Sequence, residues 1–177
     1  MIEVAPALET ERLRMRAFRK ADFRPYHAIL SEPAVHRHFG PEPSGAEDCW
    51  RRLSAGVGSW VLNGFGPWAV ERKSDGKLVG NVGLFTAWRD LDPEFGEEPE
   101  MGWIMATETH GQGIALEACN AALQWAERNL EPTLIWAIVA PANAASLKLG
   151  QKLGFERLHE IKYGGEPTVV LRRPAWA

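Results

Sequence analysis

Two glycines stand close together in the segment His110-Gly111-Gln112-Gly113-Ile114-Ala115. The segment joins an apolar run over residues 101–106 to a helical pattern over residues 114–129. Glycines at such a junction let the backbone approach a ligand closely and leave several N–H groups unpaired. The helix dipole adds about half a positive charge at the same place, which favours phosphate. The segment therefore predicts a phosphate-binding turn, with a purely structural tight turn as the alternative.

This glycine pattern fits neither of two familiar nucleotide motifs. The dinucleotide-binding fingerprint has a third Gly or Ala at a fixed spacing, where Leu116 stands in this chain. That fingerprint also usually opens a long βαβ series, whereas only about sixty residues follow this turn. A P-loop needs Lys and then Ser or Thr after its glycines, and this pair is missing. A nucleotide-dependent oxidoreductase is therefore disfavoured.

Hydrophobic periodicity predicts the elements that must position the turn. Alternating or continuously apolar segments predict seven strands, over residues 8–18, 68–71, 78–88, 101–106, 134–140, 155–161 and 168–171. Segments with a helical period predict four helices, over residues 22–30, 46–62, 114–129 and 143–153. The chain contains no repeats, linkers or low-complexity segments. The expected fold class is α/β (mixed α+β), with residues 1–177 forming one domain around a twisted sheet.

Two separated motifs resemble the acetyl-CoA signatures of the Gcn5-related N-acetyltransferases, the GNAT superfamily. The first is His110-x-x-Gly113-x-Ala115, preceded by Glu100-Met101-Gly102-Trp103-Ile104-Met105 and followed by Glu117-Ala118. The second is Asn143-Ala144-Ala145-Ser146 with Leu153-Gly154-Phe155. The segment Thr10-Glu11-Arg12-Leu13-Arg14-Met15-Arg16 is similar to the start of the branch that contains the ribosomal-protein N-terminal alanine and serine acetyltransferases. The resemblance covers about residues 8–162 and implies a single GNAT-like domain.

The resemblance implies that acetyl-CoA is the co-substrate, with its pyrophosphate on the backbone amides of the turn. The residues expected to bind it there are His110, Gly111, Gln112, Gly113, Ile114 and Ala115. The pantetheine arm is expected to run like an added strand along Ile104, Met105 and Ala106, with a backbone N–H near Met105 stabilising the oxyanion. His110 replaces the Arg or Gln that is usual in the family. Its imidazole either donates to the phosphate or faces solvent.

The implied reaction is direct attack of a primary amine on the acetyl thioester in a ternary complex. An ordinary amine has a pKa of about 10 and must lose a proton before it attacks. Glu100, a carboxylate beside an apolar strand, is the candidate base or water-positioning group, with an exposed strand-edge role as the alternative. By resemblance, Asn143 contacts the pantetheine and Ser146 acts at the thiol sulfur. Their structural alternatives are an N-cap and its capping partner.

The acceptor amine is the least defined part of the site. Acidic residues gather just before Glu100 without a neighbouring cation: Asp90, Asp92, Glu94, Glu97 and Glu98. This cluster either attracts a cationic amine, such as a peptide N-terminus or a small molecule, or forms a solvated loop. Two other functions remain open, namely an acetyltransferase acting on an antibiotic or polyamine, and a non-catalytic acyl-CoA-binding module. The spacing of His27, His36 and His38 suits no metal site.

Composition limits the remaining choices. A net charge of −3 and a pI of about 6.0 give no reason to expect nucleic-acid binding. The chain has no signal-peptide pattern and no apolar stretch near 18 residues, so we expect a cytoplasmic protein without a membrane segment. Cys49 and Cys119 are expected to be free, packed thiols. An exposed Trp50 or Trp60 would favour a homodimer.

Overall fold

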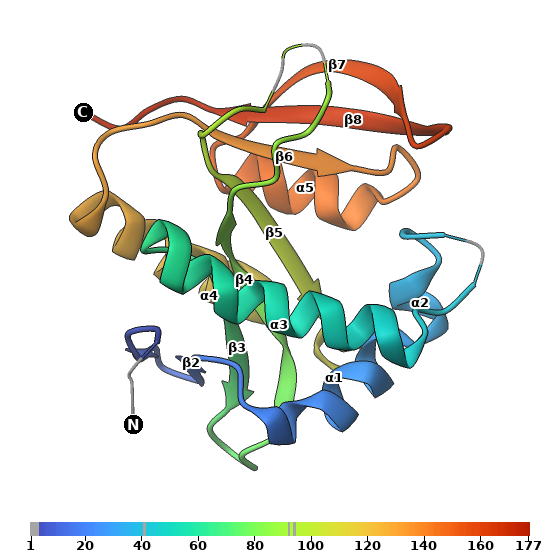
Figure 1. Ribbon diagram of the computed structural model, residues 1–177, viewed down its shortest axis with the longest axis vertical. Helices are drawn as coiled ribbons and strands as arrows, with labels where there is room; N and C mark the ends of the chain where they lie inside the picture. The colour runs from blue at the N-terminus through green and yellow to red at the C-terminus, as the bar shows by residue number, and fades with distance from the viewer. Residues whose placement is uncertain (1–3, 41, 92, 94) are drawn as a thin grey trace.

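The computed structural model describes residues 4–40, 42–91, 93 and 95–177, and its centre is one mixed sheet (Figure 1). Eight strands follow the spatial order β1-β2-β3-β4-β5-β6-β8-β7. Their bounds are Leu8–Glu9 (β1), Leu13–Arg16 (β2), Pro67–Arg72 (β3), Leu78–Phe85 (β4), Glu100–Met105 (β5), Ile135–Val139 (β6), Glu156–Tyr163 (β7) and Glu166–Arg173 (β8). The mixed α/β class is confirmed. One strand more than expected is present because the segment 8–18 turns back, so that β1 pairs antiparallel with β2.

The sheet consists of two antiparallel halves that meet at β5 and β6. Strands β1 to β5 pair antiparallel in sequence order, and β8 pairs antiparallel with both β6 and β7. Between β5 and β6 the described residues form a single parallel pair, Glu100 with Trp136. The rest of β5, toward Met105, therefore has a strand partner on one side only. Backbone groups on its other side are available to an extended ligand.

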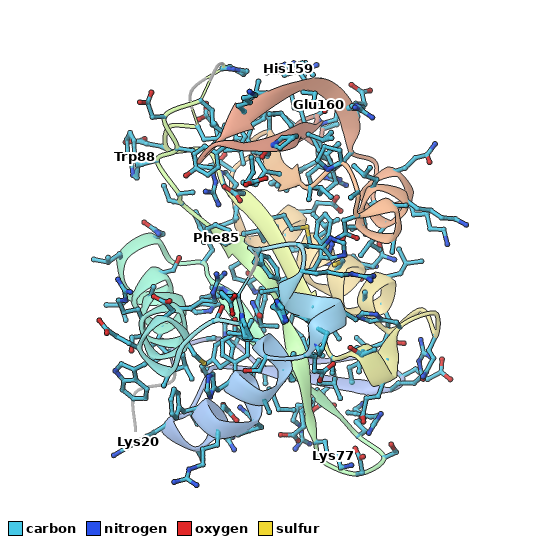
Figure 2. The ribbon with its side chains drawn as sticks, turned by 90° about the vertical axis from the view of Figure 1, so that its right-hand side faces the viewer. Lys20, Lys77, Phe85, Trp88, His159 and Glu160 are labelled. Carbon is cyan, nitrogen blue, oxygen red and sulfur yellow. The ribbon has the colours of Figure 1, made fainter. Side chains whose placement is uncertain are left out.

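Five α-helices cover the two faces of the sheet within the described part of the chain. Their bounds are Phe23–Leu30 (α1), Pro33–His36 (α2), Ala46–Asn63 (α3), Ile114–Asn129 (α4) and Ala144–Lys152 (α5). Figure 2 shows α3 on one side of the sheet and α4 on the other. Side chains of the strands alternate accordingly, because Ala69 and Ile104 pack in a cluster with α1 and α3, whereas Val70 and Met105 pack in a cluster with α4.

Helix α2 was not among the four helices expected from the sequence. Pro33 was expected only to mark the end of the preceding helix, but it occupies the first turn of α2. Proline is well tolerated there because the first N–H groups of a helix have no partner within the helix. The backbone N–H groups of Val35 and His36 both donate to the carbonyl of Glu32, which closes this short helix.

Three of the eight tryptophans form a packed cluster in the core. Trp60, Trp68 and Trp125 meet edge to face, with ring centroids 4.6 to 5.3 Å apart. The indole N–H groups of Trp60 and Trp68 donate to backbone carbonyls at 3.1 and 2.8 Å. Only 6% of Trp60 is exposed, so this residue offers no surface to a second copy. Trp50, in contrast, is 43% exposed.

Candidate functional site

The glycine turn leads directly into α4, as the sequence predicted. Gly111 and Gly113 have φ angles of 73° and 74°, in the left-handed region that favours glycine. Gly113 is the N-cap residue of α4 and receives no side-chain cap from the described residues, so the first N–H groups of the helix stay available. A Cβ placed on Gly111 would meet no heavy atom within 4 Å. The turn therefore combines free amides, the helix dipole and open space, and these features suit an anion.

Residues just before β2 hold the turn in place. Arg12 donates from Nη1 to the carbonyl of Gln112 at 2.9 Å and from Nε to Glu117 at 2.6 Å. The hydroxyl of Thr10 also donates to Glu117, at 2.5 Å. Burial acts to raise the pKa of Glu117, but the hydrogen bonds from Thr10 and Arg12 bring this pKa below its ordinary value. The Thr10 segment and the glycine turn, two separate parts of the sequence resemblance, are thus parts of one structural unit.

The side chain of His110 ties the turn to the end of β5. Its Nε2 lies 3.0 Å from the carbonyl oxygen of Met105. A carbonyl only accepts hydrogen bonds, so Nε2 carries the hydrogen. This contact differs from both roles expected for His110, which were donation to phosphate and simple exposure to solvent. His38 lies nearby, and burial, followed by the charges of Arg37 and His110, lowers the pKa of His38.

The backbone of β5 presents alternate residues to the side without a strand partner. The N–H of Ala106 donates to the carbonyl of Val79, next to β4, at 2.8 Å. Because backbone groups alternate in direction along an antiparallel strand, those of Ile104 also point toward β4, and those of Trp103 and Met105 point away from it. Of the three residues expected to line the pantetheine arm, Met105 is oriented for this contact, whereas Ile104 and Ala106 direct their N–H groups to the β4 side. Trp103, which the sequence reasoning missed, has the same orientation as Met105.

Asn143 and Ser146 lie together at the start of α5. The side-chain oxygen of Asn143 accepts a hydrogen bond from the backbone N–H of Ser146 at 3.1 Å, so Asn143 is the N-cap of this helix. The hydroxyl of Ser146 accepts a hydrogen bond from the indole Nε1 of Trp103, also at 3.1 Å. This contact joins α5 to β5 across the separation between the two half-sheets. It places Ser146 beside the backbone groups that β5 leaves unpaired.

Glu100 is buried in an ion pair rather than exposed at a strand edge. Only 3% of this residue is exposed, and its two carboxylate oxygens accept hydrogen bonds from Arg89 at 2.5 and 2.9 Å. Arg89 also donates to the hydroxyl of Tyr163 at 3.0 Å and lies over the ring of Tyr163. Burial raises the pKa of Glu100, although the hydrogen bonds and the charge of Arg89 act in the opposite direction. Arg89 was missed because it stands one residue outside the acidic segment that the sequence reasoning considered.

The acidic segment before Glu100 remains partly open to solvent. Asp90 and Glu97 are exposed, and Glu98 is half-buried. Asp92 and Glu94 lie outside the described residues. The exposed carboxylates stand within a few residues of Arg89, which carries the only ion pair printed between this loop and the sheet among the described residues. The segment therefore combines a buried anchor with exposed negative charge.

Aromatic contacts fix the rest of this loop against the second half-sheet. Phe95 stacks on Trp136 of β6, with ring centroids 4.6 Å apart and ring planes 10° from parallel. Trp88 has a φ of 45° and is the one non-glycine residue with a positive φ in the described ranges. It projects from the surface and is 62% exposed (Figure 2). A left-handed backbone at a bulky residue is strained, so the contacts around it must hold the chain in this conformation.

Helix α2 touches the same turn from the other side. The carboxylate of Glu32 accepts a hydrogen bond at 2.7 Å from the N–H of Thr107, the first residue of a short 3-10 helix, Thr107–Thr109. This bond links the helices α1 and α2 to the segment between β5 and the glycine turn. The described residues contain no group of His, Cys, Asp and Glu side chains that could hold a metal ion. No helix among them is both long and apolar enough to cross a membrane.

Comparisons with known proteins agree with this geometry. Residues 12–156 match the family model described as the acetyltransferase (GNAT) domain. A protein from Bordetella pertussis described as a GNAT-family acetyltransferase is 27% identical, and the match has a TM-score of 0.84 and covers 96% of this chain and 99% of that chain.

Two further solved structures share the fold at lower identity. The ribosomal-protein-S5-alanine acetyltransferase from Vibrio fischeri is 21% identical, with a TM-score of 0.73 and coverage of 96% of this chain and 97% of that chain. The aminoglycoside acetyltransferase AAC(6')-Ib, solved with coenzyme A, is 18% identical, with a TM-score of 0.72 and coverage of 92% and 94%. The match to the family model covers most of the chain, so this protein belongs to the GNAT acetyltransferase family.

Proposed function

We propose that this protein transfers an acetyl group from acetyl-CoA to a primary amine by direct attack in a ternary complex. One observation carries the proposal. The open glycine turn, the unpaired side of β5 and the hydroxyl of Ser146 lie along one path between the two half-sheets. AAC(6')-Ib, which shares this fold, has been solved with paromomycin and acetyl-CoA, and this supports the choice of co-substrate.

The residues along this path fit the parts of acetyl-CoA in order. The pyrophosphate would lie on the amides from Gly111 to Ala115, where the helix dipole favours its charge. The pantetheine arm would pair with the backbone of Met105 and end near Asn143. The thioester carbonyl would then lie by the N–H of Trp103, which supplies the oxyanion contact that was expected near Met105.

The chemistry needs one group for the proton of the amine and one for the departing sulfur. In our proposal, Glu100 accepts the proton through a water molecule, because its side chain is almost fully buried. The amine nitrogen then bonds to the acetyl carbon, and the bond between this carbon and sulfur breaks. Ser146 donates a hydrogen bond to the sulfur as it gains negative charge. The products are the acetylated amine and free CoA.

The acceptor is proposed only at the level of a primary amine. A peptide N-terminus is supported by the shared fold with the ribosomal-protein acetyltransferase, and a small-molecule amine by the shared fold with AAC(6')-Ib. The exposed carboxylates of Asp90 and Glu97 favour a cationic acceptor in either case. We further propose a cytoplasmic location and one acetyltransferase domain over residues 1–177. A homodimer, for which the exposed Trp50 is the available surface, is part of the same proposal.

Two measurements test the proposed function. Calorimetry should detect acetyl-CoA binding, and a thiol assay should detect free CoA when peptides, polyamines and aminoglycosides are offered as acceptors. Acetyl-CoA binding without release of CoA thiol from any amine would instead indicate the non-catalytic acyl-CoA-binding module. Absence of binding would contradict both functions.

A pair of glycine variants shows whether binding uses the proposed turn. Gly111→Val should weaken acetyl-CoA binding about tenfold or more, because a β-branched residue strains the left-handed backbone and fills the open space. Gly164→Val is the matched control. Gly164 has a φ of 58° and open space around its Cβ position, but it lies in the β7–β8 hairpin. Equal affinity in the two variants would exclude the turn as the binding site.

A further inference from the structure

The indole of Trp103 connects β5 with α5 at the centre of the proposed site. Its Nε1 lies 3.1 Å from the hydroxyl oxygen of Ser146, and the two residues are 43 positions apart in the sequence. Both side chains are half-buried. The ring of Trp103 also packs against the ring of Phe155 at a centroid distance of 6.2 Å, beyond the end of α5. The indole is therefore held from two directions.

This contact determines how Ser146 can use its hydroxyl. The indole N–H of tryptophan is a donor and has no acceptor capacity. The hydroxyl oxygen of Ser146 must therefore be the acceptor, and its own hydrogen remains available for a second partner. The backbone N–H of Ser146 is fixed as well, because it donates to the side chain of Asn143. Both the position of Ser146 and the direction of its hydrogen bonding are thus set before a ligand binds.

We infer that Trp103 is a positioning residue that presents the hydroxyl of Ser146 as a hydrogen-bond donor to the thioester sulfur. This inference rests on the proposed function. The backbone N–H of Trp103 points to the side of β5 on which the thioester is expected, so one residue serves both ends of the bond that breaks. Its N–H faces the carbonyl oxygen, and its indole holds the group that meets the sulfur. The distance between these two contacts is fixed by a rigid bicyclic side chain.

Trp136 provides a matched control on the neighbouring strand. Trp136 is 5% exposed, and its Nε1 has no hydrogen-bond partner among the described residues. Replacing this tryptophan by phenylalanine removes a buried indole without breaking a hydrogen bond. The same change at Trp103 removes a comparable ring and also the bond to Ser146. A difference in turnover between the two variants therefore reports the hydrogen bond.

The test is a double-mutant cycle on Trp103→Phe and Ser146→Ala, measured by release of CoA thiol with an accepted amine. We expect each single variant to lower kcat about tenfold and to leave the KM for acetyl-CoA nearly unchanged. The double variant should be no slower than Ser146→Ala alone, because Trp103 acts through Ser146. Trp136→Phe should keep the kcat of the natural protein.

Two outcomes would overturn the inference in distinguishable ways. Effects that multiply in the double variant would show that Trp103 acts independently of Ser146, while the proposed function stands. A natural protein that acetylates no amine would remove the proposed function, and the inference with it. Should Trp103→Phe fail to fold, a benzothienylalanine at position 103 keeps the bicyclic shape with sulfur in place of the N–H. Full kcat in that protein would also overturn the inference.

Discussion

Arg89 binds Glu100 through two parallel hydrogen bonds, from Nε to Oε2 and from Nη2 to Oε1. An ionised carboxylate has about four lone-pair sites, so this contact leaves one further acceptor site on each oxygen. Glu100 can therefore remain paired with Arg89 and still accept a hydrogen bond from a water molecule in the site. The pair is buried, and removal of one partner from such a pair typically costs about 3–5 kcal/mol of stability. Stability and catalysis are therefore measured together below.

Glu100→Gln should lower kcat about a hundredfold or more, because the amide no longer accepts the proton of the amine. The pH profile of kcat should shift toward alkali, where a larger fraction of the amine is already deprotonated. The measurement is release of CoA thiol across pH with the amine that the acceptor screen identifies. A folded variant with an unchanged profile would assign proton removal to another group.

Arg89→Lys should move the acid limb of the kcat/KM profile to higher pH. The guanidinium opposes the effect of burial on the pKa of Glu100. Lysine cannot form the bidentate contact, so the pKa of Glu100 should rise further and the base form should appear only at higher pH. The matched control is Arg157→Lys in the exposed pair between Arg157 and Glu160, which should leave the profile unchanged. An acid limb that stays in place in Arg89→Lys would separate this limb from Glu100.

Local patterns predicted most of the fold because they act over a few neighbouring residues. Helix α4 was expected over residues 114–129 and has these bounds. The N-cap role of Asn143 also follows from its own side chain and the next turn of helix. Helix α2 was missed because it is one turn long and carries too few residues for a periodic signal. The return of β1 onto β2 was missed for the same reason.

The site was less predictable because its contacts join residues far apart in the chain. Nothing next to Glu100 in the sequence shows that both carboxylate oxygens meet Arg89, 11 residues earlier. Nor does the strand pattern around Trp103 show that its indole reaches Ser146. The register of β4 with β5 also decides which backbone groups remain free, and the sequence sets no register. Such contacts become visible only when the two half-sheets are placed together.

His110 variants should show whether the imidazole supports the turn or contacts the phosphate itself. His110→Gln keeps a side-chain N–H that can reach the carbonyl of Met105, so its Kd for acetyl-CoA should stay within about threefold of the natural value. His110→Ala loses a hydrogen bond worth about 1 kcal/mol, so its Kd should rise about fivefold. Calorimetry measures both. Equal weakening in the two variants would favour direct contact of the imidazole with phosphate.

Glu117→Gln should destabilise the protein at neutral pH and lose this effect in acid. The carboxylate accepts hydrogen bonds from Thr10 and Arg12, which together hold its folded-state pKa below the ordinary 4.5. A carboxyl group with a lowered pKa stabilises the fold above its unfolded-state pKa, and this contribution disappears as pH falls through the folded-state value. The cost at pH 7 should be about 1–3 kcal/mol, since hydrogen bonds to a charged group are lost. Denaturant unfolding at pH 7 and below pH 4 measures the difference between the natural protein and the variant.

The control for this change is Glu131→Gln. Glu131 is exposed, and no ion pair is printed for it in the described part of the chain, so its replacement removes one negative charge without breaking a contact. We expect Glu131→Gln to change the free energy of unfolding by less than about 0.5 kcal/mol. A cost for Glu117→Gln that stays the same from pH 7 to acid would mean that the amide loses packing rather than charge. In that case the link from Thr10 and Arg12 to the glycine turn would not depend on the ionised carboxylate.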